Sequence, residues 1–318
     1  MKHEPRDTIW KPYGYSSDAL VRRLSHEMGA SGFQFYAESL RRMDIQPHDI
    51  VQDIGAGLGY DAYNIAGNYH PRAIFMLEPA AAALKCDPLS SFDDLFYWIE
   101  ADLIRNKDET IKLLSSSQAE QTIRALSYPA EHAFSQDVTY LQPLPSTAED
   151  NPMPDGSVTK ATIIHSAYEF YDLEAALAQL NRVLAEDGLG MLITNGVNDK
   201  LVFKSILERA GVMLKNKAPR TVSSRLTSDE ALEILGQHFN IVDVLPYTDD
   251  MLITEDTRYV PINSFNSYID RFEKKIINRD RFARVREELL EKPLDEMIGR
   301  FDYALDSIDI TAIYFRKK

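Results

Sequence analysis

Three glycines spaced two residues apart constrain the fold more than any other feature of this chain of 318 residues. They are Gly55, Gly57 and Gly59, and they follow a short apolar run at residues 49–54 and precede a segment with helical spacing. Glycine lets a chain turn sharply at the carboxyl end of a strand and lets a ligand approach the main chain. The helix that follows presents its first N–H groups to that ligand. A strand, a glycine turn and a helix predict the first unit of an α/β fold that binds a nucleotide.

The spacing of the glycines distinguishes between two classes of ligand. A site for the pyrophosphate of a dinucleotide requires Gly-x-Gly-x-x-Gly, and the third glycine of that pattern falls on Tyr60. The observed pattern is Asp-x-Gly-x-Gly-x-Gly, with Asp53 two residues before Gly55. It resembles motif I of the class I S-adenosylmethionine (SAM) methyltransferases. A strand-end carboxylate suits SAM, whose amino-acid tail carries an ammonium group; a glycine turn of another α/β protein is the alternative.

Four further landmarks, in the order of this family, extend the resemblance over about residues 45 to 195. Glu78 ends the next apolar run, where an acid can accept hydrogen bonds from both ribose hydroxyls of a nucleoside. Residues 146–158 resemble the segment between the adenine site and the fourth strand, and residues 161–168 resemble that strand and its exit. Residues 175–188 resemble the helix and glycine turn before the fifth strand. The resemblance is closest to the small-molecule methyltransferases of the ubiquinone and natural-product type.

The resemblance implies an α/β fold: a Rossmann-like, seven-stranded, mostly parallel sheet with an antiparallel last strand, an N-terminal helical cap and helical insertions. Residues 1–48 are expected to form the cap or lid, and residues 49–199 the SAM-binding core with a helical insertion at about 80–135. Residues 200–318 are expected to complete the sheet, with a helical excursion at about 255–300 that walls the substrate pocket. Within this frame, apolar periodicity predicts helices over about 16–29, 33–43, 172–185, 201–210 and 228–237.

Two local expectations concern the middle of the chain. Helical spacing of Ile111, Leu114, Ile123 and Leu126 predicts a helix over about residues 107–128. The third strand is expected at residues 138–141, followed by a loop over 142–157. Because that loop contains several prolines, beginning with Pro143, we expect it to be neither helix nor central strand.

For the cofactor site, the resemblance implies residues at the strand ends and in the loops after them: Asp53, Gly55, Ala56, Gly57, Gly59, Glu78, Pro79, Thr147, Ala148 and His165. Thr147 departs from the family, which often has an acid at this position. A threonine hydroxyl accepts a hydrogen bond from the exocyclic amine of adenine more weakly. The aromatic residues Tyr13, Tyr15 and Tyr36 are candidates for the lid, with simple packing of the cap on the core as the alternative.

Methyl transfer from SAM requires alignment of the acceptor and exclusion of water more than it requires side-chain chemistry. A hydroxyl acceptor benefits from a general base, and the exit of the fourth strand offers His165, Tyr168, Glu169 and Tyr171. For His165, contact with SAM or a structural role is the alternative. A neutral amine or an activated carbon needs no protein base, so oxygen, nitrogen and carbon acceptors all stay open.

The charge of the chain bears on its partners. A net charge of −14 argues against broad contact with phosphate backbones, so we expect a small-molecule acceptor and no nucleic-acid partner. The basic residues between Arg271 and Arg286 alternate with acids and are interpreted as a solvated helix face. The seven histidines are scattered and Cys86 is the single cysteine, so no metal site is expected. No signal peptide or membrane-spanning run is evident, which predicts a cytoplasmic protein.

Three hypotheses for function follow from the sequence. The first is a SAM-dependent methyltransferase for a small molecule. The second is a protein or RNA methyltransferase that uses the basic stretch at 271–286, although the Asn/Asp-Pro-Pro-Tyr/Phe signature of enzymes that methylate amino groups of DNA or protein is missing. The third is a non-catalytic scaffold that binds SAM or a nucleoside. An NAD-linked oxidoreductase is disfavoured because Tyr60 stands where its glycine is required.

Overall fold

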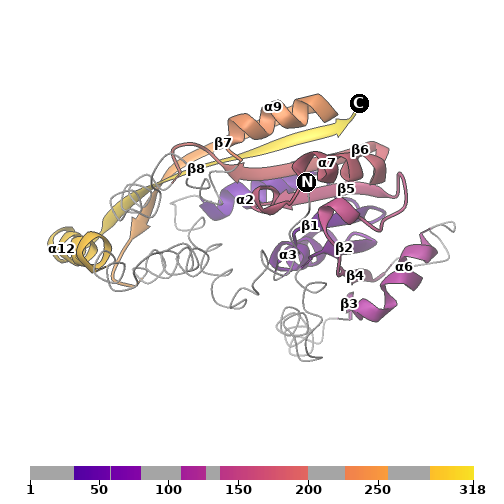
Figure 1. Cartoon of the computed structure of the whole chain (residues 1–318). Coiled ribbons are helices and arrows are strands. Elements are labelled where there is room, and N and C mark those ends of the chain that lie inside the picture. Colours follow the sequence, from indigo (N-terminus) through magenta and orange to yellow (C-terminus); the bar gives the residue numbers. More distant parts are fainter. Residues whose placement is uncertain (1–31, 58, 80–108, 127–136, 200–225, 257–286) are drawn as a thin grey trace, which may run out of the picture.

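The computed structural model describes residues 32–57, 59–79, 109–126, 137–199, 226–256 and 287–318 (Figure 1). These residues form one eight-stranded sheet. Its strands are β1 (Ile50–Ile54), β2 (Ala73–Leu77), β3 (Ile111–Leu113), β4 (Thr139–Leu144), β5 (Val158–Ile164), β6 (Leu184–Asn195), β7 (Phe239–Ile253) and β8 (Ala304–Lys317). The α-helices are α2 (Gly32–Arg42), α3 (Tyr60–Tyr69), α6 (Ala119–Ala125), α7 (Leu173–Val183), α9 (Ser228–His238) and α12 (Lys292–Phe301).

The strand order is β3-β4-β2-β1-β5-β6-β8-β7. The pairs from β3 to β6 are parallel, whereas β8 runs antiparallel to both β6 and β7. The last strand is therefore antiparallel and inserted between its neighbours, as the resemblance implied. The sheet has eight strands where seven were expected.

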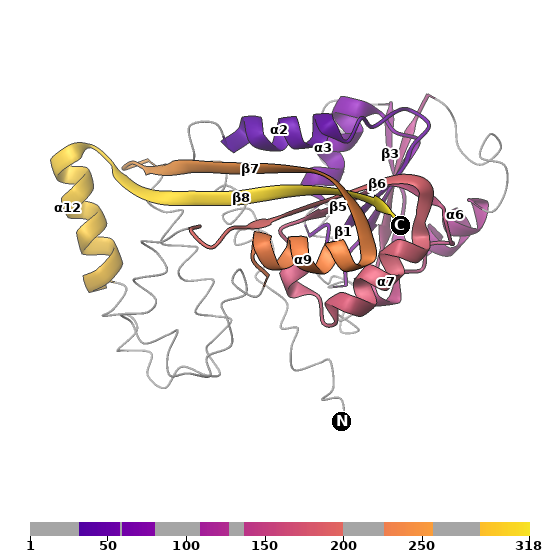
Figure 2. The same ribbon diagram turned by 90° about the horizontal axis from the view of Figure 1, so that it is seen from above.

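Helices cover both faces of the sheet, with α2 and α3 on one side and α7 and α9 on the other (Figure 2). The residues of β8 show why both faces pack well. Tyr314 belongs to the apolar core on the α2 and α3 side. Ile313 and Phe315 belong to the core on the α7 and α9 side. Because side chains alternate along a strand, a continuous apolar run is buried on both faces at once.

Local capping residues set the starts of two helices. Asp172 Oδ1 accepts a hydrogen bond from the Ala175 N–H at 3.1 Å, which caps α7. Thr227 and Glu230 form a reciprocal capping box at the start of α9. These helices and α2 confirm the helices predicted at 172–185, 228–237 and 33–43. The helices predicted at 16–29 and 201–210, the basic stretch 271–286 and Cys86 lie outside the described residues.

Two local predictions were wrong. Residues 107–128 do not form one helix, because Ile111–Leu113 is the strand β3, paired in parallel with β4, and α6 begins only at Ala119. Likewise, Pro143 lies inside β4, opposite Met76 of β2. Thr139 and Leu141 bond toward the β3 side, so Pro143, of the same parity, points its nitrogen to that side too. The β3–β4 register ends at Leu141, and the missing N–H therefore costs no ladder bond.

The last two strands project beyond the rest of the sheet. The register of β6 with β8 ends at Asn195↔Ile310, whereas β7 and β8 stay paired as far as Ile253↔Ala304. This extension passes the carboxyl end of β6, and α12 lies at its far end (Figure 2). The carboxyl edge of the sheet is where ligands of open α/β folds bind, so the β7–β8 extension borders that edge.

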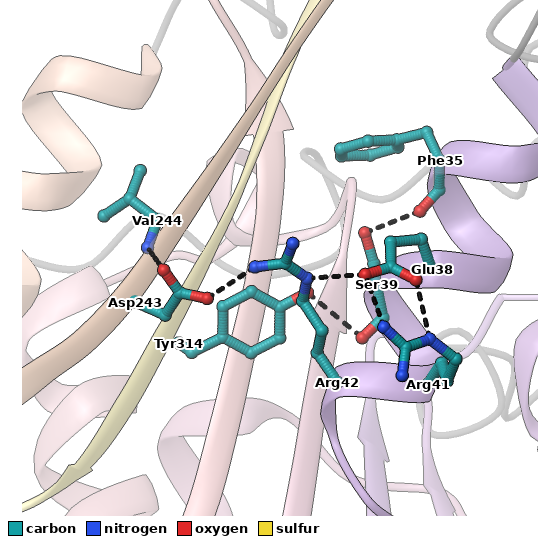
Figure 3. A network of polar contacts seen from close by, with 8 residues as sticks. All are labelled: Phe35, Glu38, Ser39, Arg41, Arg42, Asp243, Val244 and Tyr314. Carbon is teal, nitrogen blue, oxygen red and sulfur yellow. Dashed lines mark hydrogen bonds and ion pairs between the residues drawn. The ribbon is translucent and has the colours of Figure 1, made fainter.

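Helix α2 is fastened to these last strands by a polar network (Figure 3). Arg42 Nη1 donates to Asp243 Oδ2 on β7 at 2.7 Å, and its Nε donates to Glu38 Oε1 at 2.8 Å. The Tyr314 hydroxyl on β8 donates to the Ser39 carbonyl at 3.1 Å. Hydrogen bonds from Arg41 and Arg42 lower the pKa of Glu38 to about 2. The helix therefore contacts both strands through its last two turns.

Candidate functional site

The glycine turn at the end of β1 has the conformation that its sequence predicts. The φ angles of Gly55, Gly57 and Gly59 are 72°, 54° and 71°, in the left-handed region that residues with a Cβ rarely adopt. Gly55 and Ala56 donate their N–H groups to the last carbonyl of β2, Leu77, at 2.8 and 3.2 Å. The turn is therefore fixed against the neighbouring strand before α3 begins.

Gly55 is also required by a close approach. A Cβ at this position would overlap the side chain of Ser166 in the segment after β5. The Ser166 hydroxyl in turn donates to the Ile54 carbonyl at 2.7 Å. The exits of β1 and β5 are thus joined by direct contact.

Glu78, the residue after β2, reaches the glycine turn. Its Oε2 accepts a hydrogen bond from the Gly57 N–H at 2.8 Å, and the residue is only 8% exposed. A Cβ at Gly57 would meet a single atom within 4 Å, the Gly55 carbonyl oxygen at 4.0 Å, so there is room beside this backbone. The structure therefore brings together the predicted strand-end acid and the middle glycine. Pro79 follows and is half-buried.

Asp53 is held within the sheet, one residue before the end of β1. It is buried, and its Oδ1 accepts from the Thr162 hydroxyl of β5 at 2.9 Å. The carboxylate therefore lies between β1 and β5, the two strands whose exits meet at Ser166.

The loop after β4 carries the two residues expected beside adenine. Thr147 caps the short 3₁₀ helix Ala148–Asp150, and its hydroxyl accepts from the Asp150 N–H at 3.2 Å. Ala148 is buried in the core on the α7 side. Arg182 of α7 fixes the next part of the loop, since it donates to the carbonyls of Asn151 and Met153 at 2.7 and 2.8 Å.

His165 directly follows β5 and has a φ of 51°, which is uncommon for a residue with a Cβ. Its N–H donates to the Ile193 carbonyl of β6 at 2.9 Å. Its Nε2 lies 2.6 Å from the hydroxyl of Tyr36, which comes from α2. Of the three lid candidates, Tyr36 is the one that the structure describes, and it is buried against the strand exit.

The other two candidate bases point to different surroundings. Tyr168 lies on the 3₁₀ helix Ala167–Glu169 and packs against the core on the α7 side. Tyr171 is 54% exposed, and its backbone N–H donates to Glu149 Oε1 at 2.7 Å. The structure therefore unites His165 with Tyr36 and leaves Tyr168 and Tyr171 apart from that contact.

Several residues of the site were missed at the level of sequence. Ser166 and Glu149 act through contacts between loops that are distant in sequence, and no local pattern marks them. Gln52 carried a signal, because a polar residue inside the apolar strand Ile50–Ile54 requires a buried partner. That partner is Asn151, 3.0 Å away.

Within the described residues, no group of three or more His, Cys, Asp or Glu side chains is arranged to hold a metal ion. None of the helices in that part of the chain is long and apolar enough to cross a membrane.

Comparison with protein-family models finds no match. Comparison with curated proteins finds none either. Solved structures do match. A candidate methyltransferase from an antibiotic biosynthesis pathway of Anabaena variabilis aligns with a TM-score of 0.52 at 15% identity, over 89% of this chain and 96% of that protein.

Two other solved structures align less closely. A candidate methyltransferase of Bacillus halodurans has a TM-score of 0.49 at 14% identity, over 88% of this chain and 97% of that one. Phosphoethanolamine N-methyltransferase 2 of Haemonchus contortus, bound to S-adenosylhomocysteine, has a TM-score of 0.46 at 12% identity, over 95% and 57%. Taken with the strand order, the alignment to the Anabaena protein shows that this chain has the Rossmann-like fold of the class I methyltransferases.

Proposed function

We propose that this protein is a SAM-dependent methyltransferase that acts on a small-molecule acceptor. The observation that carries the proposal is the hydrogen bond from the Gly57 N–H to Glu78, at the carboxyl edge of the sheet. It places a carboxylate, a left-handed glycine turn and the start of α3 in one place. Ligands of this fold bind at that edge.

The residues fit SAM in three respects. Glu78 is placed to exchange its contact with Gly57 for the ribose hydroxyls of a nucleoside. The backbone of Gly57 has space beside it that a side chain would fill. No dinucleotide glycine stands at Tyr60, the first residue of α3, which argues against a pyrophosphate ligand. In this proposal Asp53 faces the ammonium end of SAM, and Thr147 and Ala148 lie beside adenine.

A small acceptor is favoured over a macromolecule by charge and shape. The net charge of −14 opposes contact with nucleic acid. The β7–β8 extension and α12 border the carboxyl edge, where they narrow access to the site. A protein or RNA methyltransferase, and a SAM-binding scaffold without turnover, are the competing functions.

Calorimetric titration with SAM, S-adenosylhomocysteine and NAD tests the cofactor. We expect SAM and S-adenosylhomocysteine to bind and NAD not to bind. Gly57→Arg should abolish binding because the side chain fills the ligand space. Gly156→Arg is a matched control: Gly156 also has a positive φ, 63°, and open space around it, but it is exposed and lies before β5.

The outcomes separate the competing functions. Absence of SAM binding contradicts the proposal, and binding of NAD means that the glycine turn serves a dinucleotide. SAM binding that Gly156→Arg abolishes as completely as Gly57→Arg would point to backbone strain, not to occupied space. Salt-sensitive binding of RNA or protein favours the macromolecular acceptor. Tight SAM binding without turnover of any acceptor favours the scaffold.

A further inference from the structure

A side-chain contact joins α2 to the exit of β5. The Tyr36 hydroxyl lies 2.6 Å from His165 Nε2, and the two rings meet edge to face at 6.0 Å. Tyr36 is 4% exposed. A buried tyrosine hydroxyl and an imidazole in direct hydrogen bond can pass a proton between them without water.

The backbone of His165 is held in an unfavourable conformation to make this contact. A φ of 51° costs a residue with a Cβ on the order of 1–3 kcal/mol, and such strain persists where the surroundings over-determine it. Two bonds do so here: the His165 N–H to the Ile193 carbonyl, and the hydroxyl of the next residue, Ser166, to the Ile54 carbonyl. The ring is therefore aimed from the strand end toward α2.

Tyr36 is positioned just as firmly. The ring of its neighbour Phe35 stacks on Tyr247 of β7 with centroids 5.1 Å apart. Further along α2, Ser39 is bonded to Tyr314 and Arg42 to Asp243 (Figure 3). Contacts on both sides of Tyr36 thus fix the helix that carries it.

A second polar group lies at the end of the next strand. Asn195 ends β6, is 2% exposed, and its Oδ1 accepts no hydrogen bond from any residue that the structure describes. By strand alternation it shares a face with Ile193, whose side chain lies in the same core as Tyr36. A buried amide oxygen without a donor is costly, and a ligand with an N–H or O–H group removes that cost.

We propose that Tyr36 is a catalytic residue that contacts the acceptor, that His165 acts through Tyr36, and that the acceptor is a hydroxyl or an ammonium group that loses a proton on methylation. This inference rests on the proposed methyltransferase function. It selects a chemical class of acceptor that the cofactor site leaves open.

The step balances as follows. A lone pair of the acceptor oxygen attacks the methyl carbon of SAM, and the carbon–sulfur bond breaks with its electron pair going to sulfur. The acceptor proton passes to the Tyr36 oxygen while the Tyr36 proton passes to His165 Nε2. The sulfonium charge is thereby replaced by an imidazolium charge, and the products are S-adenosylhomocysteine and the methyl ether. An ammonium acceptor transfers its proton first, by the same route, and is then methylated as the amine.

The test uses the full chain with SAM and six defined acceptors. Catechol, 4-hydroxybenzoate, benzyl alcohol and benzylamine carry a proton to lose, whereas pyridine and dimethyl sulfide are methylated without losing one. We expect turnover with at least one of the first four. With that acceptor, Tyr36→Phe and His165→Gln should each lower kcat by at least about 100-fold, the range for loss of a general base. SAM affinity should stay within about threefold.

Two readouts separate proton transfer from a structural role. The double variant should be no slower than either single variant, because residues that act as one unit are not additive. Tyr69→Phe, at the far end of α3 from the glycine turn, is the matched control and should keep kcat. Turnover restricted to pyridine or dimethyl sulfide, no turnover with any of the six, or unchanged kcat in Tyr36→Phe would each overturn the inference. Absence of SAM binding by the unmodified chain would instead be a failure of the proposed function.

Discussion

The side-chain amides of Gln52 and Asn151 hydrogen bond to each other in both directions, with each nitrogen 3.0 Å from the opposite oxygen. Gln52 lies on β1 and Asn151 lies in the loop after β4, and both are buried. Asn151 Oδ1 also accepts from the Met153 N–H at 3.1 Å. The pair therefore fixes the loop expected to border adenine to the strand that leads into the glycine turn.

Removing one partner of this pair should destabilise the protein. Asn151→Ala leaves the Gln52 amide buried without its partner, which costs about 1–3 kcal/mol. Urea unfolding followed by circular dichroism measures this loss. The double variant Gln52→Ala/Asn151→Ala should lose less than the sum of the two single variants.

Asn68→Ala is the control for the amide pair. Asn68 is exposed on α3 and donates only to the Asn64 carbonyl one turn earlier. Its removal should change the free energy of unfolding by no more than about 0.5 kcal/mol. Strict additivity of the Gln52 and Asn151 variants would contradict the coupling.

The features predicted from sequence are those that short segments determine. The glycine turn follows from spacing and residue type, and the caps at Asp172 and Thr227 follow from local hydrogen bonding. The antiparallel position of β8 came from resemblance, and the alternation of its residues agreed with it. These predictions need no knowledge of which segments meet in space.

The features that sequence did not predict depend on contacts between distant segments. The strand β3 has three residues, too few to show a period, and it exists because β4 pairs with it. Pro143 is compatible with β4 only because β3 ends first. The contact between Tyr36 and His165 joins positions 129 residues apart. Each case required the register of the sheet before its physical reason became visible.

Arg182 should not tolerate replacement by lysine. Its guanidinium donates to the carbonyls of Asn151 and Met153 and to Gln179 Oε1, at 2.7, 2.8 and 2.9 Å. A lysine ammonium is a single point and cannot reproduce this planar fork. Arg182→Lys should therefore lower the free energy of unfolding by about 1–3 kcal/mol. Because the loop carries the residues expected at adenine, SAM affinity should fall as well.

Arg124→Lys is the matched control for Arg182. Arg124 lies on α6, is 75% exposed and pairs with Glu120 one turn earlier. Exposed pairs of this kind contribute about 0.3–0.5 kcal/mol, so the variant should unfold almost as the parent does. A comparable loss in both variants would show that the fork geometry at Arg182 is unimportant.

The same glycine-to-alanine change should have opposite signs at two positions. Gly190 of β6 is paired with Phe315 of β8, and a Cβ there would overlap the Phe315 ring. Gly190→Ala should therefore destabilise the protein by at least about 1–3 kcal/mol. Gly236 is exposed within α9 and has no atom within 4 Å of a Cβ. Gly236→Ala should stabilise it by about 0.5–1 kcal/mol. Thermal unfolding of both variants measures the difference, and equal signs would contradict the packing argument.

Tyr314 links stability to alkaline pH. Burial raises the pKa of its hydroxyl to about 12, from an ordinary value near 10. Between these values the unfolded chain releases the proton while the folded chain keeps it. The unfolded state then binds fewer protons, so the free energy of unfolding falls as pH rises. The stabilisation by this group is complete below pH 10 and is lost as pH rises toward 12.

Tyr314→Phe should remove this dependence. At pH 8 the variant should be less stable by about 0.5–1.5 kcal/mol, because the Ser39 carbonyl loses its hydrogen bond from the Tyr314 hydroxyl. From pH 10 to 11.5 the parent should lose stability faster than the variant, and the difference between them should shrink. Urea unfolding across this range measures both curves, and the tyrosinate absorbance should lack one late-titrating group in the variant. Because Tyr69 titrates in both proteins, parallel curves would mean that Tyr314 does not titrate late in the folded state.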